Sequence, residues 1–287
     1  MNDNKSRDIF YGVVAIATLI VAIVGATLAY FSISASSNEG AVNAKAKVVS
    51  INYLDTQQVT AQAEELIPSD LKIMQYYYEM AKATGDFTTE GTHDVNKCQD
   101  ANNEEICSVY RFSVSIDSGN ENITAMLRSE DNDFNYLAYA VREVSCTPGL
   151  AVTSETTYDT FSSGANYAQY TSCWLDLGNG KSQGLARCSN NTENDAPNCY
   201  TEDENHIKTY SDSNPAAINS IFGYSSGEPV SKEITGVPKT YDLVLFLKEN
   251  NNNQNADQGK EFSGTILVEV TGKEGDSGII TGRTTSN

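Results

Sequence analysis

Six cysteines are the residues of this chain best suited to do chemistry, and the chemistry that they indicate is disulfide formation. They are Cys98, Cys107, Cys146, Cys173, Cys188 and Cys199. An even number of cysteines is typical of a disulfide framework in an oxidising compartment, although six cysteines allow about 15 connectivities. Proximity along the chain suggests two short loops, from Cys98 to Cys107 and from Cys188 to Cys199, which leaves Cys146 and Cys173 as a third pair.

A zinc site is the alternative use of these cysteines. The sequence has no C-x-x-C pair, and its two histidines, His93 and His206, lack partners at zinc-finger spacing. There is also no phosphate-binding loop, no dinucleotide-binding glycine motif and no H-E-x-x-H. Two histidines leave little capacity for acid–base catalysis at neutral pH. We therefore expect no enzyme activity, no catalytic residues and no cofactor.

Two acidic stretches could hold a divalent cation. One is residues 130–133, Glu-Asp-Asn-Asp, whose oxygens suit calcium but lack the spacing and the glycine of an EF-hand loop. The other is residues 202–204, Glu-Asp-Glu, just before His206. A metal-dependent hydrolase would need a tight site around that histidine. Solvated acidic loops are the simpler interpretation of both, so any calcium would bind weakly.

Length and charge exclude one large class of function. The chain has 287 residues and a formal net charge of −19, with 38 acidic against 19 basic residues. This acidic balance argues against nucleic-acid binding, which needs a basic surface. The length is sufficient for a substantial core. Only 39% of the residues are hydrophobic, and many of these lie in one N-terminal run.

That run, from Ile9 to Phe31, contains 23 uncharged positions preceded by basic residues. As a helix it would reach roughly 34 Å, enough to cross a membrane. We expect residues 1–29 to be a signal peptide or a membrane anchor. Thr27 and Ala29 offer the small side chains that a signal peptidase requires, with Tyr30 as the first mature residue. Both alternatives place the rest of the chain outside the cytoplasmic membrane, at the cell surface or beyond. The removed part carries two acidic and two basic residues, so the exported part keeps the whole charge of −19.

Strand patterns dominate the exported part, and the fold class that they predict is mainly β. The clearest strands are residues 48–54, 109–116, 123–127, 137–144, 241–247 and 265–270. Segment 109–116 alternates apolar and polar side chains, whereas 241–247 is apolar on both faces. Such a set predicts a β-sandwich or jelly-roll-like domain. One short helix is expected from Leu71 to Thr84, capped by Ser69-Asp70 and ended by Gly85.

Three regions follow the N-terminal segment. We expect one sandwich domain over residues 30–271, interrupted at about 145–235 by an insertion that holds four of the cysteines and the single tryptophan. A stretch of that length is too long for a bare loop, so disulfides should pin some internal structure. Residues 250–260 read as a polar hairpin loop. Residues 272–287 are rich in Gly, Ser and Thr and predict a flexible tail.

The segment from Val24 to Ser32 resembles the signal region of the TasA/camelysin family of bacterial biofilm-matrix proteins. Leu66-Ile67-Pro68-Ser69-Asp70 is similar to a Leu-x-Pro-Gly-Asp turn of that family, and residues 112–123 are similar to its strand, turn and strand passage. A third similar stretch is residues 260–265. The resemblance implies a dedicated signal peptidase that cleaves after Ala29, and a jelly-roll-like sandwich. It also implies fibres in which residues from about Tyr30 to Leu54 are donated as a strand to the next subunit. Ile33, the six cysteines and the insertion depart from the family pattern.

Two functions follow from these features. The first is an exported structural protein of a bacterial surface or extracellular matrix, which forms fibres by strand donation. The second is a membrane-anchored adhesin or pilin-like binding module that keeps its N-terminal helix. Such a module would use the cysteine-rich insertion, or its many tyrosines, to bind a surface glycan or protein.

Overall fold

The fold is described from a computed structural model, and the described residues are 51–58, 66–84, 98–116, 119–190, 196–204, 206, 208–210, 218–257, 259–270 and 280–285. All described residues belong to one compact unit, residues 49–287. The side chains of residues 51–58 and 280–285 are not described, so these two strands are placed by their backbones alone.

The first antiparallel sheet has the order β1–β3–β13–β5–β6. Its strands are β1 (Ile51–Gln58), β3 (Glu105–Ile116), β13 (Lys239–Leu247), β5 (Leu137–Glu143) and β6 (Gln183–Gly184). A short strand, β2 (Cys98–Gln99), pairs with the start of β3 and places Cys98 opposite Cys107. In the middle of the sheet, β13 pairs along most of its length with β3 on one side and β5 on the other.

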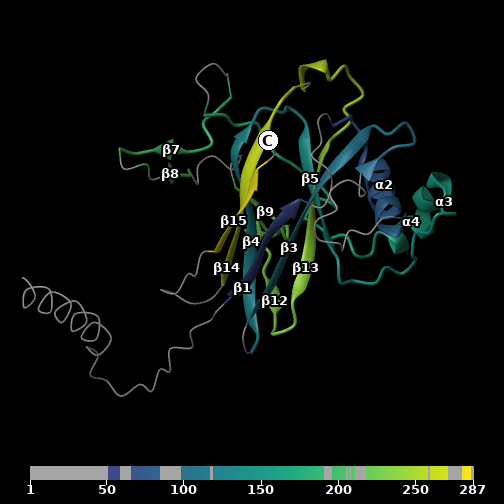
Figure 1. Ribbon diagram of the computed structural model, residues 1–287, viewed down its shortest axis with the longest axis horizontal. Coiled ribbons are helices and arrows are strands. Elements are labelled where there is room, and N and C mark those ends of the chain that lie inside the picture. The colour runs from purple at the N-terminus through teal and green to yellow at the C-terminus, as the bar shows by residue number, and fades with distance from the viewer. Residues whose placement is uncertain are drawn as a thin grey trace, which may run out of the picture. The chain divides into compact units, whose positions relative to one another are not determined.

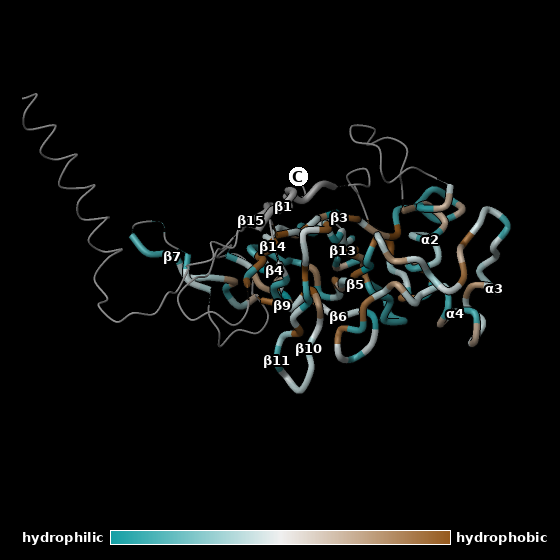
Figure 2. The backbone as a smooth tube through the Cα atoms, turned by 90° about the horizontal axis from the view of Figure 1, so that it is seen from below, coloured by the Kyte–Doolittle hydropathy of each residue, from teal (hydrophilic) through white to brown (hydrophobic). Residues whose placement is uncertain are grey.

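The second antiparallel sheet has the order β12–β4–β14–β15, with β9 also paired to β4. These strands are β12 (Lys232–Ile234), β4 (Glu121–Asn132), β14 (Phe262–Val270), β15 (Ile280–Thr285) and β9 (Ile218–Ser220). The two sheets lie side by side in both views of the backbone, with β4 and β14 in one and β13 and β5 in the other (Figures 1 and 2).

Both sheets contribute inward side chains to one core. Strands β3, β5 and β13 belong to the first sheet, whereas β4 and β14 belong to the second. Every second residue of β3, from Tyr110 through Phe112 to Ile116, is buried in the same cluster as Leu127 of β4 and Ile266 of β14. The alternation of apolar and polar residues in the sequence thus places every second side chain in one apolar layer between the two sheets. The prediction of a mainly β fold is confirmed, and its sheets are antiparallel.

The predicted helix is confirmed as α2 (Leu71–Thr84), which covers the other face of the first sheet. Asp70 begins it: its Oδ1 atom accepts a hydrogen bond of 2.8 Å from the backbone N–H of Ile73. Met74 and Tyr78, one turn apart, are fully buried against Val244 and other residues of the outer sheet face. Figures 1 and 2 show α2 on the side of this sheet that faces away from the second sheet. The second sheet covers one face of β13 and α2 covers the other, which explains why this strand is apolar on both faces.

The insertion contributes short elements rather than a long bare loop. They include two helices, α3 (Tyr158–Ser162) and α4 (Gly164–Tyr170), and the short hairpins β7 (Thr201–Glu202) with β8 (Lys208–Thr209), and β10 (Tyr224–Ser225) with β11 (Glu228–Pro229). Strand β6 of the insertion extends the first sheet, while β9 and β12 extend the second. The insertion also supplies Leu177, Ile221 and Phe222 to the core between the sheets. It is thus part of the same folded unit.

Two sequence-based expectations are wrong in detail. Residues 280–285 of the predicted flexible tail form β15, which pairs with β14 from Ser263 to Val268. Isoleucine and threonine in this stretch suit a strand, and the pairing satisfies backbone groups that β14 would otherwise expose. Residues 250–260 do not close a hairpin, because β13 and β14 belong to different sheets; they cross between the sheets and contain a short 3₁₀ helix, η1 (Asn255–Asp257).

Candidate functional site

All six cysteines are paired in three disulfides. The pairs are Cys98–Cys107, Cys146–Cys173 and Cys188–Cys199, at sequence separations of 9, 27 and 11 residues. These are the pairs that proximity along the chain suggests. Disulfides persist in oxidising environments, so the folded unit belongs to an extracellular type of compartment.

A row of charged side chains crosses the outer face of the first sheet beneath α2. Asp242 of β13 lies in register with Arg111 of β3 on one side and with Arg142 of β5 on the other. Its carboxylate accepts two hydrogen bonds from Arg111, of 2.7 Å from Nε and 2.8 Å from Nη2. Asp242 is fully buried and the Arg111 side chain is 15% exposed. This is the two-bond geometry that makes an arginine–carboxylate pair strong.

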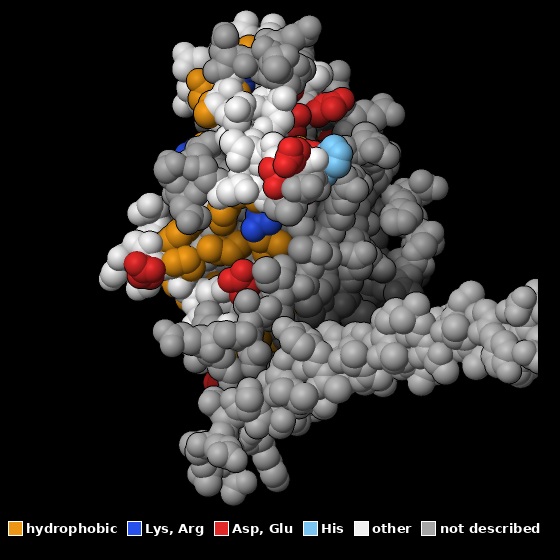
Figure 3. All heavy atoms as spheres, turned by 90° about the vertical axis from the view of Figure 1, so that its left-hand side faces the viewer, with side chains coloured by type: hydrophobic (Ala, Val, Ile, Leu, Met, Phe, Trp, Pro, Cys, Tyr) orange, Lys and Arg blue, Asp and Glu red, His pale blue; other side chains and the backbone are white. Residues whose placement is uncertain are grey.

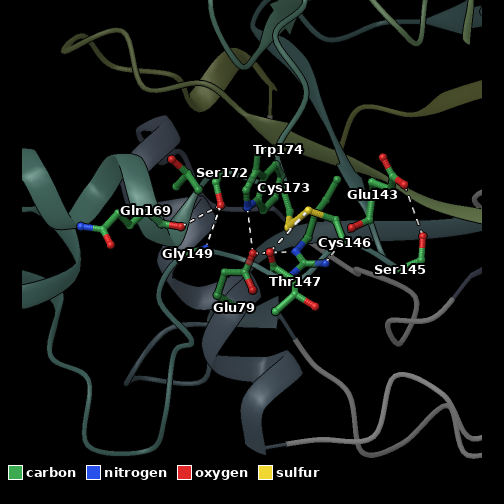
Figure 4. The surroundings of a disulfide bond; sticks show 12 residues. Glu79, Glu143, Ser145, Cys146, Thr147, Gly149, Gln169, Ser172, Cys173 and Trp174 are labelled. Atoms are coloured by element: carbon green, nitrogen blue, oxygen red, sulfur yellow. Dashed lines mark hydrogen bonds and ion pairs between the residues drawn. A yellow bond between two sulfur atoms is a disulfide. The ribbon is translucent and has the colours of Figure 1, made fainter.

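Helix α2 completes the row with a second carboxylate. Glu79 accepts a hydrogen bond of 2.7 Å from Nε of Arg142, and the same Oε1 atom accepts one of 2.9 Å from Nε1 of Trp174. Figure 4 shows the bond from Trp174 to Glu79 next to the disulfide of Cys173 with Cys146. Two arginines and two carboxylates therefore form a charge-balanced buried cluster that spans three strands, α2 and the insertion.

Tyr78 ties α2 to the middle of the row. Its hydroxyl donates a hydrogen bond of 2.6 Å to Oδ2 of Asp242, and its ring meets that of Trp174 edge to face at 4.9 Å. Burial and the charge of Asp242 hold the pKa of Tyr78 well above its usual value. Burial alone would lower the pKa of Arg142, but Glu79, Tyr78 and Asp242 together outweigh burial, so the pKa is raised. Tyr78 thus stays protonated and the two arginines stay charged around neutral pH. These side chains therefore hold α2 against the first sheet rather than transfer protons.

Buried tyrosines make the fold sensitive to alkali. Burial raises the pKa of Tyr110 to about 12. In the unfolded chain this hydroxyl ionises near pH 10, so above that pH the unfolded state binds fewer protons than the native state. The free energy of unfolding should therefore fall as the pH rises from 10 to 12, by about 2–3 kcal/mol for this residue. Urea unfolding at intervals from pH 8 to pH 12 measures the fall. In Tyr110→Phe the fall should be shallower, and an unchanged pH dependence would contradict the assignment.

The acidic stretch 130–133 does not converge on one point. Glu130 accepts a hydrogen bond of 2.7 Å from Thr265 and lies 3.3 Å from the ammonium of Lys208. Asn132 is buried, and its side chain binds the backbone of Ala186 and Phe134. Burial, with the neighbouring Asp133, raises the pKa of Asp131. These side chains are engaged in holding the end of β4, which is a structural use.

His206 lies on the surface beside the β7–β8 hairpin. Its Nδ1 atom is 2.6 Å from Oε1 of Glu202, and its side chain is 88% exposed. Figure 3, which views the molecule from the side of β7 and β8 in Figure 1, shows acidic side chains exposed on this face. In the part of the chain that the structure describes, no group of three His, Cys, Asp or Glu side chains could hold a metal ion.

Gly223-Tyr224-Ser225-Ser226-Gly227 matches the G-x-S-x-G pattern of serine hydrolases. The structure places it across β10 and the turn that leads to β11, and Gly223 and Gly227 have positive φ angles of 85° and 87°. A nucleophile elbow needs a strand that turns into a helix. This hairpin has a strand on both sides, so the match carries no catalytic geometry.

The predicted cleavage residues Thr27, Ala29 and Tyr30 lie outside the described residues. Among the helices that are described, none is long and apolar enough to span a membrane.

The edges of the two sheets meet at one side of the unit. Strand β1 ends the first sheet and β15 ends the second, and these two strands contact each other. No other strand of the described chain pairs with their outer edges. The opposite edge of the first sheet differs, because residues 173–175 and 183–185 of the insertion hydrogen-bond to β5 between Leu137 and Glu143. Unpaired backbone groups at a sheet edge are a template for another strand.

Comparisons of the chain with models of protein families, with curated proteins and with solved structures gave no match. The evidence on its function therefore comes from the disulfides, the open sheet edges and the sequence.

The sequence patterns did not predict the charged row, although isolated charges in two apolar strands indicate it. Asp242 stands alone in an apolar strand, and Arg142 lies near the end of another. An isolated charge in a strand buried on both faces requires a buried partner. The alternation of 109–116 puts Arg111 on the polar face of its strand, but α2 covers that face and Arg111 is largely buried.

Proposed function

We propose that the chain is an exported structural protein of a bacterial surface or extracellular matrix, which assembles into fibres by donation of an N-terminal strand. It acts through its disulfide-bonded β-sandwich and not as an enzyme. The proposal rests on the resemblance of its N-terminal segment to the TasA/camelysin family and on the three disulfides, which belong to an oxidising compartment.

The open edge at β1 is the observation that carries the proposal furthest. The expected donor segment, residues 30–54, overlaps β1 in residues 51–54, and these pair with residues 113–116 of β3 in the same chain. The segment that would be donated thus leads directly into the edge of the first sheet. A strand from a neighbouring chain would either replace β1 on β3 or extend the sheet beyond β1. Main-chain hydrogen bonds supply the affinity in such an addition.

Deletion of residues 30–45 should abolish fibres while the folded unit remains. The deletion removes most of the donor segment and keeps β1 and the six cysteines. Fibres are scored by electron microscopy of the mature protein. A second variant replaces residues 30–45 by a Gly/Ser sequence of equal length, which keeps the reach of the segment but lowers its strand propensity. It should fail to form fibres as well.

Both variants should retain the far-ultraviolet circular dichroism of the intact protein, which controls for folding. Fibres formed by either variant would contradict strand donation. An intact mature protein that remains monomeric would contradict fibre formation itself.

A further inference from the structure

A small cavity opens where the crossover between β13 and β14 packs against the segment that precedes α2. Its volume is about 160 Å³. One wall is apolar and is formed by Leu66, Ile67, Pro68, Phe134 and Leu247. Most of the remaining lining is polar and includes Asp257, the last residue of η1, together with Glu249 and Lys260. The cavity is thus amphipathic.

Asp257 has one satisfied oxygen and one free oxygen. It is 3% exposed. Oδ1 accepts two hydrogen bonds from Asn135, of 2.8 Å from the backbone N–H and 2.7 Å from Nδ2. Oδ2 is buried, and within the described residues it has no hydrogen-bond partner. A buried carboxylate oxygen without a donor is costly, so a donor is expected from outside the chain's described atoms.

The loop around Asp257 is built to hold the carboxylate in place. Gln254 is 8% exposed, and its Nε2 atom donates a hydrogen bond of 3.0 Å to the carbonyl of Lys248. The backbone N–H of Asp257 donates one of 2.9 Å to the carbonyl of Gln254. Ser69 fixes the apolar wall to the same loop through backbone bonds of 2.9 Å with Leu247 and 3.0 Å with Glu249. Both walls are therefore positioned before any ligand arrives.

We propose that this cavity binds an ammonium group carried on a short aliphatic stem, the chemistry of a lysine side chain. The free oxygen of Asp257 would accept a hydrogen bond from the ammonium, and the apolar wall would cover the stem. An arginine fits less well, because a guanidinium pairs with both oxygens of a carboxylate and Oδ1 of Asp257 already serves Asn135. A divalent cation fits less well, since it needs several oxygen ligands and half of the cavity is apolar.

The test compares two probes with the same stem. Nα-acetyl-lysine-N-methylamide carries the ammonium, and Nα-acetyl-norleucine-N-methylamide ends in a methyl group. Binding to the full-length chain in mild detergent is followed by NMR titration. The lysine probe should bind at least about tenfold more tightly than the norleucine probe, the factor of one charge-assisted hydrogen bond. Asp257→Asn should remove this preference, whereas Asp159→Asn, at an exposed aspartate of α3, should keep it.

Three results would overturn the proposal. Equal affinity for the two probes, or no saturation by either, would show that the ammonium is not recognised. Calcium binding that is lost in Asp257→Asn, without lysine binding, would assign the oxygen to a cation site. A lysine of the chain itself, Lys260, also lines the cavity. Binding of the lysine probe to Lys260→Met but not to the unmodified chain would show that the chain fills its own site.

Discussion

Replacing Asp242 with alanine should lower the free energy of unfolding by about 3–5 kcal/mol, the usual cost of breaking a buried ion pair. The change removes the carboxylate that binds Arg111 in two hydrogen bonds and accepts the hydroxyl of Tyr78. Arg142, in register on the other side, keeps Glu79 as its partner. Arg111 then loses its carboxylate partner, and its positive charge is left uncompensated next to a site where the Asp242 side chain is 0% exposed.

Urea unfolding at neutral pH measures this loss. Asp159→Ala, at an exposed aspartate of α3, is the matched control and should change stability by less than about 0.5 kcal/mol. A double variant, Asp242→Leu with Arg111→Met, removes the pair as a whole and should recover part of the loss, since an apolar pair avoids the uncompensated charge. A loss of stability below about 1 kcal/mol for Asp242→Ala would contradict the claim that this buried charged cluster stabilises the packing of α2 on the first sheet.

Removing the disulfide between Cys146 and Cys173 should cost about 3–4 kcal/mol. It closes the longest of the three loops, with a sequence separation of 27 residues, and the loss of loop entropy in the unfolded chain grows with that length. The native state should also change locally. Cys173 precedes Trp174, whose side chain is 3% exposed and binds Glu79 (Figure 4). Freeing Cys173 loosens the segment that holds this indole against α2.

Two readouts check the disulfide prediction in the double variant Cys146→Ala, Cys173→Ala. Urea unfolding gives the loss of stability, and the fluorescence of Trp174, the single tryptophan of the chain, should shift to longer wavelength under native conditions. The control is the double variant Cys188→Ala, Cys199→Ala, which should lose about 3 kcal/mol without that shift. Unchanged fluorescence together with a loss below about 1 kcal/mol would contradict the assigned role.

Much of the fold follows from local patterns. Alternation in 109–116 and the two-faced apolar run 241–247 predict strands because side chains alternate across a sheet, and both become central strands of the first sheet. Leu71–Thr84 is a helix, although its tyrosines would also suit a strand, because Asp70 caps it and its buried residues repeat at helical spacing. These elements needed no information beyond their own residues.

What could not be predicted depends on pairing between distant segments. The composition around residues 280–285 predicts a flexible tail, whereas in the structure these residues form a strand by pairing with the edge of β14. Asp257 lies in a polar run between strands, and its burial follows from contacts with Asn135, which is 122 residues away. The row from Arg111 to Asp242 to Arg142 likewise requires the register of three strands. Local composition cannot specify such contacts, because they are fixed only when the sheets assemble.

The central claim is that this chain is an exported, disulfide-bonded structural protein. Intact-mass spectrometry of the native protein, recovered from outside the producing cells and alkylated without reduction, tests it most directly. The expected mass is that of a chain beginning at Tyr30 with none of its six cysteines alkylated. A chain with the intact N-terminus would favour the membrane-anchored alternative. A chain found only inside the cells, with alkylated cysteines, would contradict the account.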